Sequence, residues 1–342
     1  MRVALDAAPL TLSSGGLARY VRELHRALEA AFPEDEFPLL AQPAAPRGFS
    51  ERRWWLCGLA RELARRRVQV FHGTNFEVPY LPLRPSVLTL HDLSPWMEAA
   101  WHSGADRVRR RTPYLVGLGL ATMVVTPSQT VRRQVIERFR VSPQRVVAVP
   151  EAAASHLHPA PGSHAEPYFL FLATLEPRKN IRMLLEAWRE ARKRAPVDLV
   201  LAGRRREDFP ALPEEPGLTV LGEIAEERLA AWYSGALAFV YPSLYEGFGL
   251  PVVEAMQCGA AVIASRDPAI SEVAAGAAVQ VDARDARGWT EALVAAATRP
   301  EWIAGLRAKS LERARDFSWE RTARLTREVY QEALERFGAA DS

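Results

Sequence analysis

Residues 236–265 read ALAFVYPSLYEGFGLPVVEAMQCGAAVIAS. An apolar run (236–243) leads into a turn that contains glycine. Pro251 then suits the first turn of a helix and Gly259 its end, and a second apolar run follows (260–265). A strand, a helix and a strand in this order predict two parallel strands joined by a crossover helix. This stretch therefore predicts an α/β fold.

The same alternation of strand and helix occurs twice along the 342 residues. The first set of predicted strands covers 3–8, 68–73, 87–92, 123–128 and 145–150, and the second covers 168–177, 197–203, 218–223, 236–243, 260–265 and 277–282. Such alternation is typical of parallel sheets covered by helices on both faces. We therefore predict an α/β protein with two Rossmann-like, doubly wound domains that face a cleft, because ligands of such sheets bind at the carboxyl ends of the strands.

The predicted domains are 1–155 and 166–317. The stretch EAAASHLHPAPGSHAEP (151–167) has no periodicity and is predicted to be a linker about which the domains close. The last stretch, 318–342, is a long amphipathic helix with Ser318 as its N-cap. We expect this helix to cross back and pack on the first domain.

The composition excludes several classes of protein. There is no run of 18 apolar residues, so no membrane span is expected, and the N-terminus has no signal-peptide pattern. Cys57 and Cys258 lack metal-ligand spacing and fit a reducing cytoplasm. No nucleic-acid-binding module is evident. The segment ERRWWLCGLARELARRR (51–67) allows two interpretations, a helix packed on its own sheet or a helix on a membrane surface.

Two glutamates lie on either side of the turn in the opening stretch. Gly247 and Gly249 let a ligand approach the backbone closely, and a helix N-terminus favours phosphate. Glu246 and Glu254 would repel a bare phosphate, but they can accept hydrogen bonds from sugar hydroxyls. The combination therefore predicts a sugar nucleotide as ligand. The structural alternative is an ordinary helix start with an exposed Glu254.

The positive charge for such a ligand is expected from LEPRKN (175–180). Arg178 and Lys179 follow a predicted strand and precede a helix that Asn180 could cap, and this chain has only three lysines. Arginine and lysine together would neutralise a diphosphate. The alternative is a pair of solvated charges, but positive charge is unfavourable at a helix start.

Lys179, Glu246 and Glu254 resemble the signature of the retaining family 4 glycosyltransferases, which have the GT-B fold. The E-x7-E element, the G-x-L-x-P-x-K-like stretch, the Gly15-Gly16 loop and LHDL (90–93) carry this resemblance. Two features depart from the family pattern: Ala173-Thr174 replaces a common Gly-Arg, and VPEAAASHLHP stands at the domain joint. The composition and length are also similar to those of actinomycete antibiotic glycosyltransferases.

The resemblance implies a role for each matching residue. Glu246 would contact the transferred sugar, Glu254 the ribose of the donor, and Arg178 and Lys179 the diphosphate. The remaining implied contacts are a phosphate at Gly15 and Gly16, the reacting sugar at His91, and backbone amides at Phe248, Gly249 and Leu250. The structural alternative for His91 is a strand-end histidine satisfied by its neighbours.

The resemblance also implies the substrates and the absence of a metal. No D-x-D pair lies at a strand end, and VDARD (281–285) has the wrong spacing, so we expect no metal and no cofactor. The donor would be a nucleoside-diphosphate sugar, with its base near Gly203–Arg204 and Glu223–Ile224. The acceptor would be a glycan, a lipid-linked glycan or a natural product, selected by 94–118.

Two other functions remain open at this point. A nicotinamide dehydrogenase would need G-x-G-x-x-G directly after the first strand, and LSSGGLARY (12–20) does not provide it. An inactive GT-B protein that binds a glycan or a partner is the second alternative, against which the intact Lys179, Glu246 and Glu254 argue.

Overall fold

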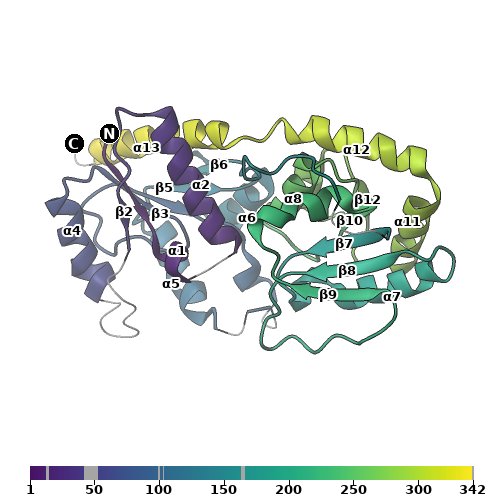
Figure 1. Ribbon diagram of the computed structural model, residues 1–342. Coiled ribbons are helices and arrows are strands. Elements are labelled where there is room, and N and C mark those ends of the chain that lie inside the picture. The colour runs from purple at the N-terminus through teal and green to yellow at the C-terminus, as the bar shows by residue number, and fades with distance from the viewer. Residues whose placement is uncertain (13–14, 42–52, 99–100, 103, 163–165, 341–342) are drawn as a thin grey trace. The chain divides into compact units, whose positions relative to one another are not determined.

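The computed structural model describes residues 1–342 apart from 13–14, 42–52, 99–100, 103, 163–165 and 341–342. The chain divides into two compact units (Figure 1). The first comprises Met1–Glu151 and Ser318–Ser342, and the second comprises Ala152–Phe317. Parts of three segments singled out above, 51–67, 94–118 and 151–167, lie outside the described residues.

The first unit is built on a parallel sheet. Its strands are β1 (Val3–Asp6), β2 (Leu39–Leu40), β3 (Val70–Gly73), β4 (Ser86–Thr89), β5 (Met123–Thr126) and β6 (Val146–Ala148). Their order is β2-β1-β3-β4-β5-β6, and each neighbouring pair is parallel. The helical segments are α1 (Ala8–Leu12), α2 (Gly16–Ala31), η1 (Trp54–Gly58), α4 (Leu59–Arg65), η2 (Ser94–Trp96), α5 (Asp106–Gly117), α6 (Gln129–Phe139), η4 (Pro143–Arg145) and α13 (Trp319–Ala340).

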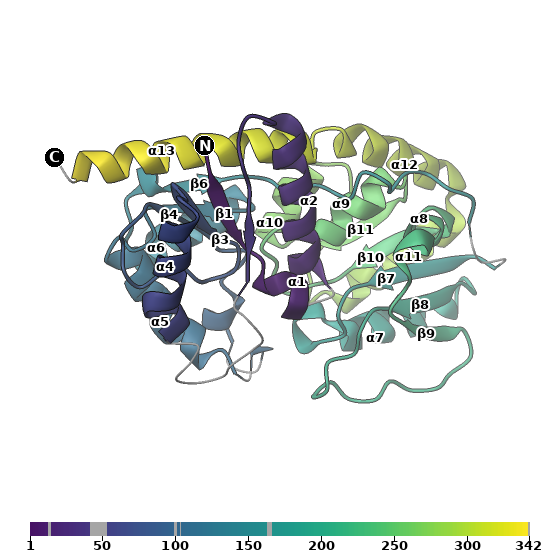
Figure 2. The ribbon, with the colours of Figure 1, turned by 60° about the vertical axis from the view of Figure 1, so that its left-hand side comes forward.

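The C-terminal helix α13 belongs to the first unit (Figure 2). It packs against α2 and against strands β3, β4 and β5. Ser318 caps it, since the Ser318 Oγ accepts a hydrogen bond from the Arg321 N–H at 3.2 Å. The prediction that this helix crosses back to the first domain is confirmed.

The described part of the arginine- and tryptophan-rich segment packs on its own sheet. Trp55 is buried and meets Phe71 edge to face, with ring centroids 6.3 Å apart. Leu59 and Leu63 are buried beside it, whereas Leu56 is exposed. No helix among the described residues is long and apolar enough to span a bilayer.

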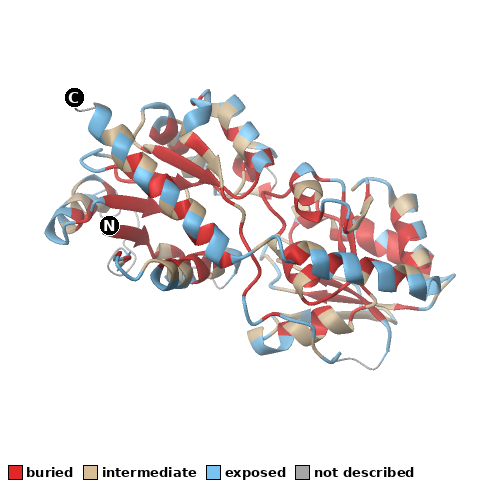
Figure 3. Ribbon diagram, turned by 90° about the horizontal axis from the view of Figure 1, so that it is seen from above, coloured by how far each residue is buried: buried red, intermediate tan, exposed pale blue. Residues whose placement is uncertain are grey.

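The second unit repeats the architecture. Its strands are β7 (Tyr168–Leu172), β8 (Asp198–Ala202), β9 (Leu218–Gly222), β10 (Ala238–Tyr241), β11 (Val262–Ser265) and β12 (Val279–Val281), in the order β12-β11-β10-β7-β8-β9, all parallel. The helical segments are η5 (Pro177–Lys179), α7 (Ile181–Arg192), α8 (Glu226–Gly235), α9 (Leu250–Gln257), α10 (Pro268–Ala274), α11 (Ala286–Thr298) and α12 (Pro300–Ala314). Most strands of both sheets are buried (Figure 3), as expected for parallel sheets covered on both faces, but the edge strand β9 is partly exposed.

Two local predictions need correction. Ala152–Ala154 and Leu157 are buried in the second unit, and the carbonyls of Ala154 and Leu157 accept hydrogen bonds from Gln257 Nε2, so the first part of the predicted linker is packed and not free. Asn180 precedes α7 but does not cap it. Its backbone is left-handed, with φ of 57°, and its side chain donates to the carbonyls of Ala283 and Pro242 instead.

Each sheet has a switch point, where the chain reverses the direction in which it adds strands. In the first unit this point lies between β1 and β3, because β2 is on one side of β1 and the later strands are on the other. In the second unit it lies between β7 and β10. Ligands of open α/β sheets bind beyond the carboxyl ends of the strands at such points. A binding site is therefore expected in the loops that follow β1, β3, β7 and β10.

Candidate active site

The switch point of the second unit carries an ionic cluster of Arg178, Lys179 and Glu246. Arg178 and Lys179 lie in the short helical turn η5 after β7, and Glu246 lies in the loop after β10. A backbone hydrogen bond from the Leu244 N–H to the Arg178 carbonyl, at 2.9 Å, joins the two loops. The topology thus brings together residues that are 67 and 68 positions apart in the sequence.

Glu246 is bound by both cations. Lys179 Nζ donates to Glu246 Oε1 at 2.5 Å, and Arg178 donates to Glu246 Oε2 at 2.9 Å. Lys179 also donates to the Tyr241 hydroxyl at 2.7 Å. Lys179 and Glu246 are each only 6% exposed. These contacts fix the carboxylate and both cations in one arrangement.

Charge, and not only geometry, defines this cluster. Burial alone would raise the pKa of Glu246, but Arg178 and Lys179 outweigh it and lower that pKa to about 2. Burial lowers the pKa of Lys179, and the charge of Glu246 opposes this effect. The Glu246 carboxylate is therefore ionised at neutral pH and lies beside two cationic donors.

Further charged residues surround the cluster. Glu176 accepts hydrogen bonds from Arg178 at 2.8 Å and from Arg206 at 3.4 Å. Asp267 accepts one from the Glu246 N–H at 3.3 Å and caps α10 by accepting from Ala269 N and Ile270 N. Burial, assisted by the charge of Glu246, raises the pKa of Asp267 to about 6.

The N-terminus of α9 begins immediately after the loop of Glu246. Gly249 has φ of 98°, a left-handed conformation that glycine adopts without strain, and α9 begins at Leu250. Phe248 is buried against Phe317, with ring centroids 5.8 Å apart. The helix start at Leu250 agrees with the prediction from Pro251. The first turn of α9 thus presents backbone N–H groups next to the ionic cluster in the chain.

Glu254 lies in the interior of the second unit. It is 2% exposed, and its Oε2 accepts a hydrogen bond from the Tyr233 hydroxyl at 2.8 Å. The alternative of an exposed Glu254 is therefore wrong. Its predicted contact with ribose stays a prediction.

In the first unit, His91 is held by two acceptors. Its Nε2 lies 2.9 Å from the Thr74 carbonyl, and its Nδ1 lies 3.0 Å from Glu151 Oε1. The Thr74 carbonyl can only accept, so Nε2 donates to it. Burial lowers the pKa of His91, but the hydrogen bond and the charge of Glu151 outweigh burial and raise it. The neighbours satisfy both nitrogens, as the structural alternative expected.

The Gly15-Gly16 loop lies at the start of α2. Gly15 is the N-cap residue, and both glycines are exposed. A Cβ atom added at Gly16 would meet nothing within 4 Å. The packing of the unit therefore does not require glycine at 16, and a ligand could approach its backbone.

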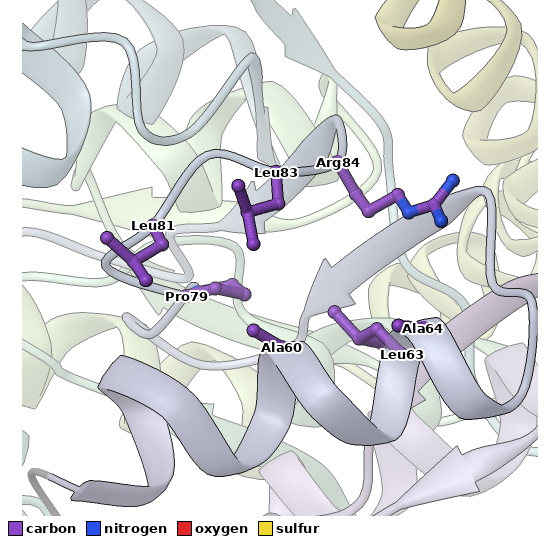
Figure 4. A pocket seen from close by; sticks show the side chains of 7 residues that line it. All are labelled: Ala60, Leu63, Ala64, Pro79, Leu81, Leu83 and Arg84. Carbon is purple, nitrogen blue, oxygen red and sulfur yellow. The ribbon is translucent and has the colours of Figure 1, made fainter.

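The structure also contains an apolar hollow that does not fit the predicted ligand (Figure 4). It has a volume of about 130 Å³ and is lined by Ala60, Leu63, Ala64, Pro79, Leu81, Leu83 and Arg84. A sugar nucleotide needs a larger site with convergent polar groups. Among the described residues, no three His, Cys, Asp or Glu side chains come close enough to hold a metal ion.

Sequence reasoning did not identify three residues of the ionic site: Arg206, Tyr241 and Asp267. Asp267 had a usable signal, since Asp before Pro268 marks a helix N-cap. The other two became evident only from the fold, because their partners lie in distant segments.

Both units match known glycosyltransferases. Residues 166–299 match the model of "Glycosyl transferases group 1", and residues 14–154 match that of "Glycosyltransferase Family 4". Among solved structures, sucrose-phosphate synthase from Thermosynechococcus elongatus aligns with a TM-score of 0.79 at 21% identity, covering 97% of this chain and 98% of that one. Anabaena HepE in complex with UDP and glucose aligns with a TM-score of 0.72 at 15% identity, covering 97% and 100%. The fold is thus the GT-B fold.

Curated relatives define the family. The O-antigen chain mannosyltransferase B of Escherichia coli is 33% identical over 285 residues, which are 77% of this chain and 74% of the relative. The serotype-specific mannosyltransferase WbdA of Escherichia coli is 28% identical over 75% of this chain, but only 34% of that relative is covered. This chain belongs to the family 4, or group 1, glycosyltransferases, which excludes the dehydrogenase alternative.

Proposed function

We propose that this glycosyltransferase is a retaining enzyme that moves a sugar from a nucleoside-diphosphate sugar to a hydroxyl of a glycan or a glycosylated natural product, without a metal ion. The observation that carries the proposal is the cluster of Arg178, Lys179 and Glu246 at the switch point of the second unit. It offers two cations and an ionised carboxylate in the loops that precede α7 and α9.

The roles follow from charge. Arg178 and Lys179 bind the diphosphate and, with the first N–H groups of α9, stabilise the negative charge that develops as it leaves. This set of donors supplies what a metal ion supplies in other transferases. Glu246 orients the hydroxyls of the transferred sugar and faces the positive charge that develops on that sugar. Glu254 binds the ribose.

Retention in this scheme needs no protein nucleophile. The bond between the sugar C1 and the diphosphate oxygen breaks, and the acceptor oxygen forms a bond to C1 on the same face. The acceptor proton passes to the departing diphosphate. His91, whose pKa is raised by the hydrogen bond and charge of Glu151, would face the reacting sugar.

Mannose is the first candidate for the transferred sugar. The relatives that support this choice are mannosyltransferases, two of which are described as O-antigen chain enzymes. A bacterial surface glycan is accordingly the first acceptor class to examine. Natural-product and lipid-linked acceptors are the second.

The experiment is a transfer assay with GDP-mannose, UDP-glucose and a dTDP-sugar, each with a panel of methyl glycosides, with and without EDTA. We expect one donor to be consumed at the same rate in EDTA and to give a product with the donor's anomeric configuration by NMR. An inverted product would contradict retention, and activity abolished by EDTA would contradict metal independence. Absence of both transfer and donor hydrolysis would favour the inactive GT-B protein.

A further inference from the structure

The switch point of the first unit contains a buried carboxyl group with a single hydrogen-bond donor among the described residues. Asp6 ends β1 and is 5% exposed. Within the part of the chain that the structure describes, its carboxyl group accepts one hydrogen bond, from the Ala8 N–H to Oδ1 at 3.1 Å. Its second oxygen accepts no hydrogen bond from the described residues.

A second unsatisfied acceptor lies in the adjoining loop. The side-chain oxygen of Asn75 is buried and has no hydrogen-bond partner among the described residues. Asn75 follows Thr74, whose hydroxyl donates to the Asp6 carbonyl at 2.8 Å and so ties this loop to the end of β1. Two oxygens that accept no hydrogen bond from the described residues therefore lie at the end of β1 and in the loop after β3.

The loop that carries Asn75 is held in one conformation. A Cβ atom on Gly73 would lie 1.6 Å from the Glu77 carbonyl oxygen, so glycine is required there. Phe76 has φ of 57°, which is unfavourable for a residue with a side chain. Arg111 from α5 binds the Glu77 carboxylate and donates to the Phe76 carbonyl at 3.4 Å. The loop is thus fixed from outside, while the Asn75 side-chain oxygen has no partner among the described residues.

The charge of this site selects the kind of ligand. Burial, assisted by the nearby Glu77, raises the pKa of Asp6 to about 7. The Asp6 carboxyl group and the Asn75 oxygen are acceptors, so they suit a ligand that donates hydrogen bonds. A polyhydroxylated, uncharged ligand supplies such donors. The nucleoside diphosphate does not fit here, whereas a sugar acceptor does.

We infer that Asp6 and Asn75 form a subsite in the first unit that accepts hydrogen bonds from the hydroxyls of the acceptor sugar. The inference rests on the proposed function and specifies the chemistry of its acceptor. It assigns the binding of a neutral sugar to the loops after β1 and β3, in addition to the segment 94–118. It follows from the same topological rule that places Arg178 and Glu246 at the other switch point.

The test measures the acceptor KM of Asp6→Asn and Asn75→Ala, with methyl α-D-mannopyranoside and other neutral methyl glycosides as acceptors. Each lost hydrogen bond is expected to raise that KM, by about tenfold or more for Asp6→Asn and by less for Asn75→Ala. Donor hydrolysis without acceptor and affinity for the nucleoside diphosphate should stay at wild-type values. Glu137→Gln, at an exposed position on α6 of the same unit, is the control and should change nothing.

The outcomes separate this inference from the proposed function. If wild type binds the nucleoside diphosphate and transfers sugar, but both variants keep the wild-type acceptor KM, the subsite is wrong and the proposed function stands. The subsite is also wrong if wild type uses only phosphorylated acceptors and no neutral glycoside. If wild type binds no nucleoside diphosphate at all, the proposed function fails first. If Asp6→Asn does not fold, Asn75→Ala alone decides.

Discussion

Glu246 lies between two cations that would also bind the ligand's phosphates. In this position the carboxylate offsets the repulsion between Arg178 and Lys179 and is itself held in a single orientation. Replacing it by glutamine removes its charge but leaves both cations available. The residue can therefore affect the reaction without being needed for the binding of free nucleoside diphosphate.

We expect Glu246→Gln to lower kcat by about 100-fold or more, because a charge that acts on the transition state is lost. Affinity for the free nucleoside diphosphate should be unchanged or higher. Steady-state kinetics and calorimetric titration test this. Glu254→Gln is the comparison, and it should weaken nucleoside diphosphate and donor alike. The roles of the two glutamates would be reversed if Glu246→Gln lost the ligand while turnover at saturation survived.

Ionisation of the Asp6 carboxyl group should lower the free energy of unfolding as the pH rises. Its pKa is raised from 3.8 to about 7, so the folded state holds this proton more tightly than the unfolded chain does. Its contribution to the free energy of unfolding is complete below pH 3.8 and is lost as the pH rises to about 7. Asp6→Asn should therefore stabilise the first unit at pH 8 by roughly 1–4 kcal/mol, and much less at pH 4.

Urea unfolding of wild type and Asp6→Asn at the two pH values measures this difference. An equal loss of stability at both would show that the carboxyl group supports the fold. A variant that is more stable but binds acceptor less well would instead mark a residue retained for function.

At the scale of single residues, the sequence predicted which charged side chains belong to the site but not which of them pair with one another. Arg178, Lys179 and Glu246 could be identified because charged residues near a helix start need a reason. That Glu246 binds both cations depends on β7 and β10 being neighbours in the sheet, which spacing along the chain does not reveal. The sequence could not predict that one oxygen of Asp6 accepts no hydrogen bond either, since the hydrogen-bond partners of a buried group depend on the folded structure.

At the scale of elements, α9 is the helix whose two ends were predictable. Glycine lies near both, with φ of 98° at Gly249 and 71° at Gly259. Pro251 and these glycines are local signals, and local signals determine where this helix lies. Asn180 shows the limit of such signals. A residue suited to a cap instead bonds to carbonyls that only the tertiary structure brings near.

Gly249→Ala and Gly259→Ala form a matched pair. Each should cost about 1–2 kcal/mol of stability, because alanine is strained in a left-handed conformation. Only Gly249→Ala should also weaken nucleoside-diphosphate binding, since it distorts the first turn of α9. Thermal unfolding and titration of both variants measure the two effects. If both variants bound the nucleoside diphosphate with equal affinity, the N-terminus of α9 would not be part of the binding site.

At the scale of the whole chain, the last helix completes the first unit. Tyr330 on α13 is buried, and its hydroxyl lies 2.8 Å from Nδ1 of His72 on β3, 258 residues away. The other ring nitrogen of His72 lies 2.7 Å from the Thr89 hydroxyl. Burial, together with the charge of His91, lowers the pKa of His72 to about 3, so this ring is neutral. The amphipathic pattern predicted the helix, but not this bond.

We expect Tyr330→Phe to lower the free energy of unfolding by about 1–3 kcal/mol, because it leaves a buried nitrogen of His72 without its partner. Affinity for nucleoside diphosphate, assigned to the second unit, should not change. Denaturant unfolding and titration of the same preparation measure both. A loss of affinity without a loss of stability would contradict this assignment.

The central claim is that Lys179 meets the diphosphate of the donor. Calorimetric titration of wild type, Lys179→Ala and the control Lys193→Ala, with a nucleoside diphosphate and with its nucleoside, tests it most directly. Lys193 is an exposed lysine at the C-terminal end of α7, where it pairs with Glu190. Lys179→Ala should weaken binding of the nucleoside diphosphate by about 1.5–3 kcal/mol, because a charge-assisted bond to phosphate is lost. Its affinity for the nucleoside should not change. Equal losses for both ligands, or none for either, would show that the ionic cluster is not the diphosphate site.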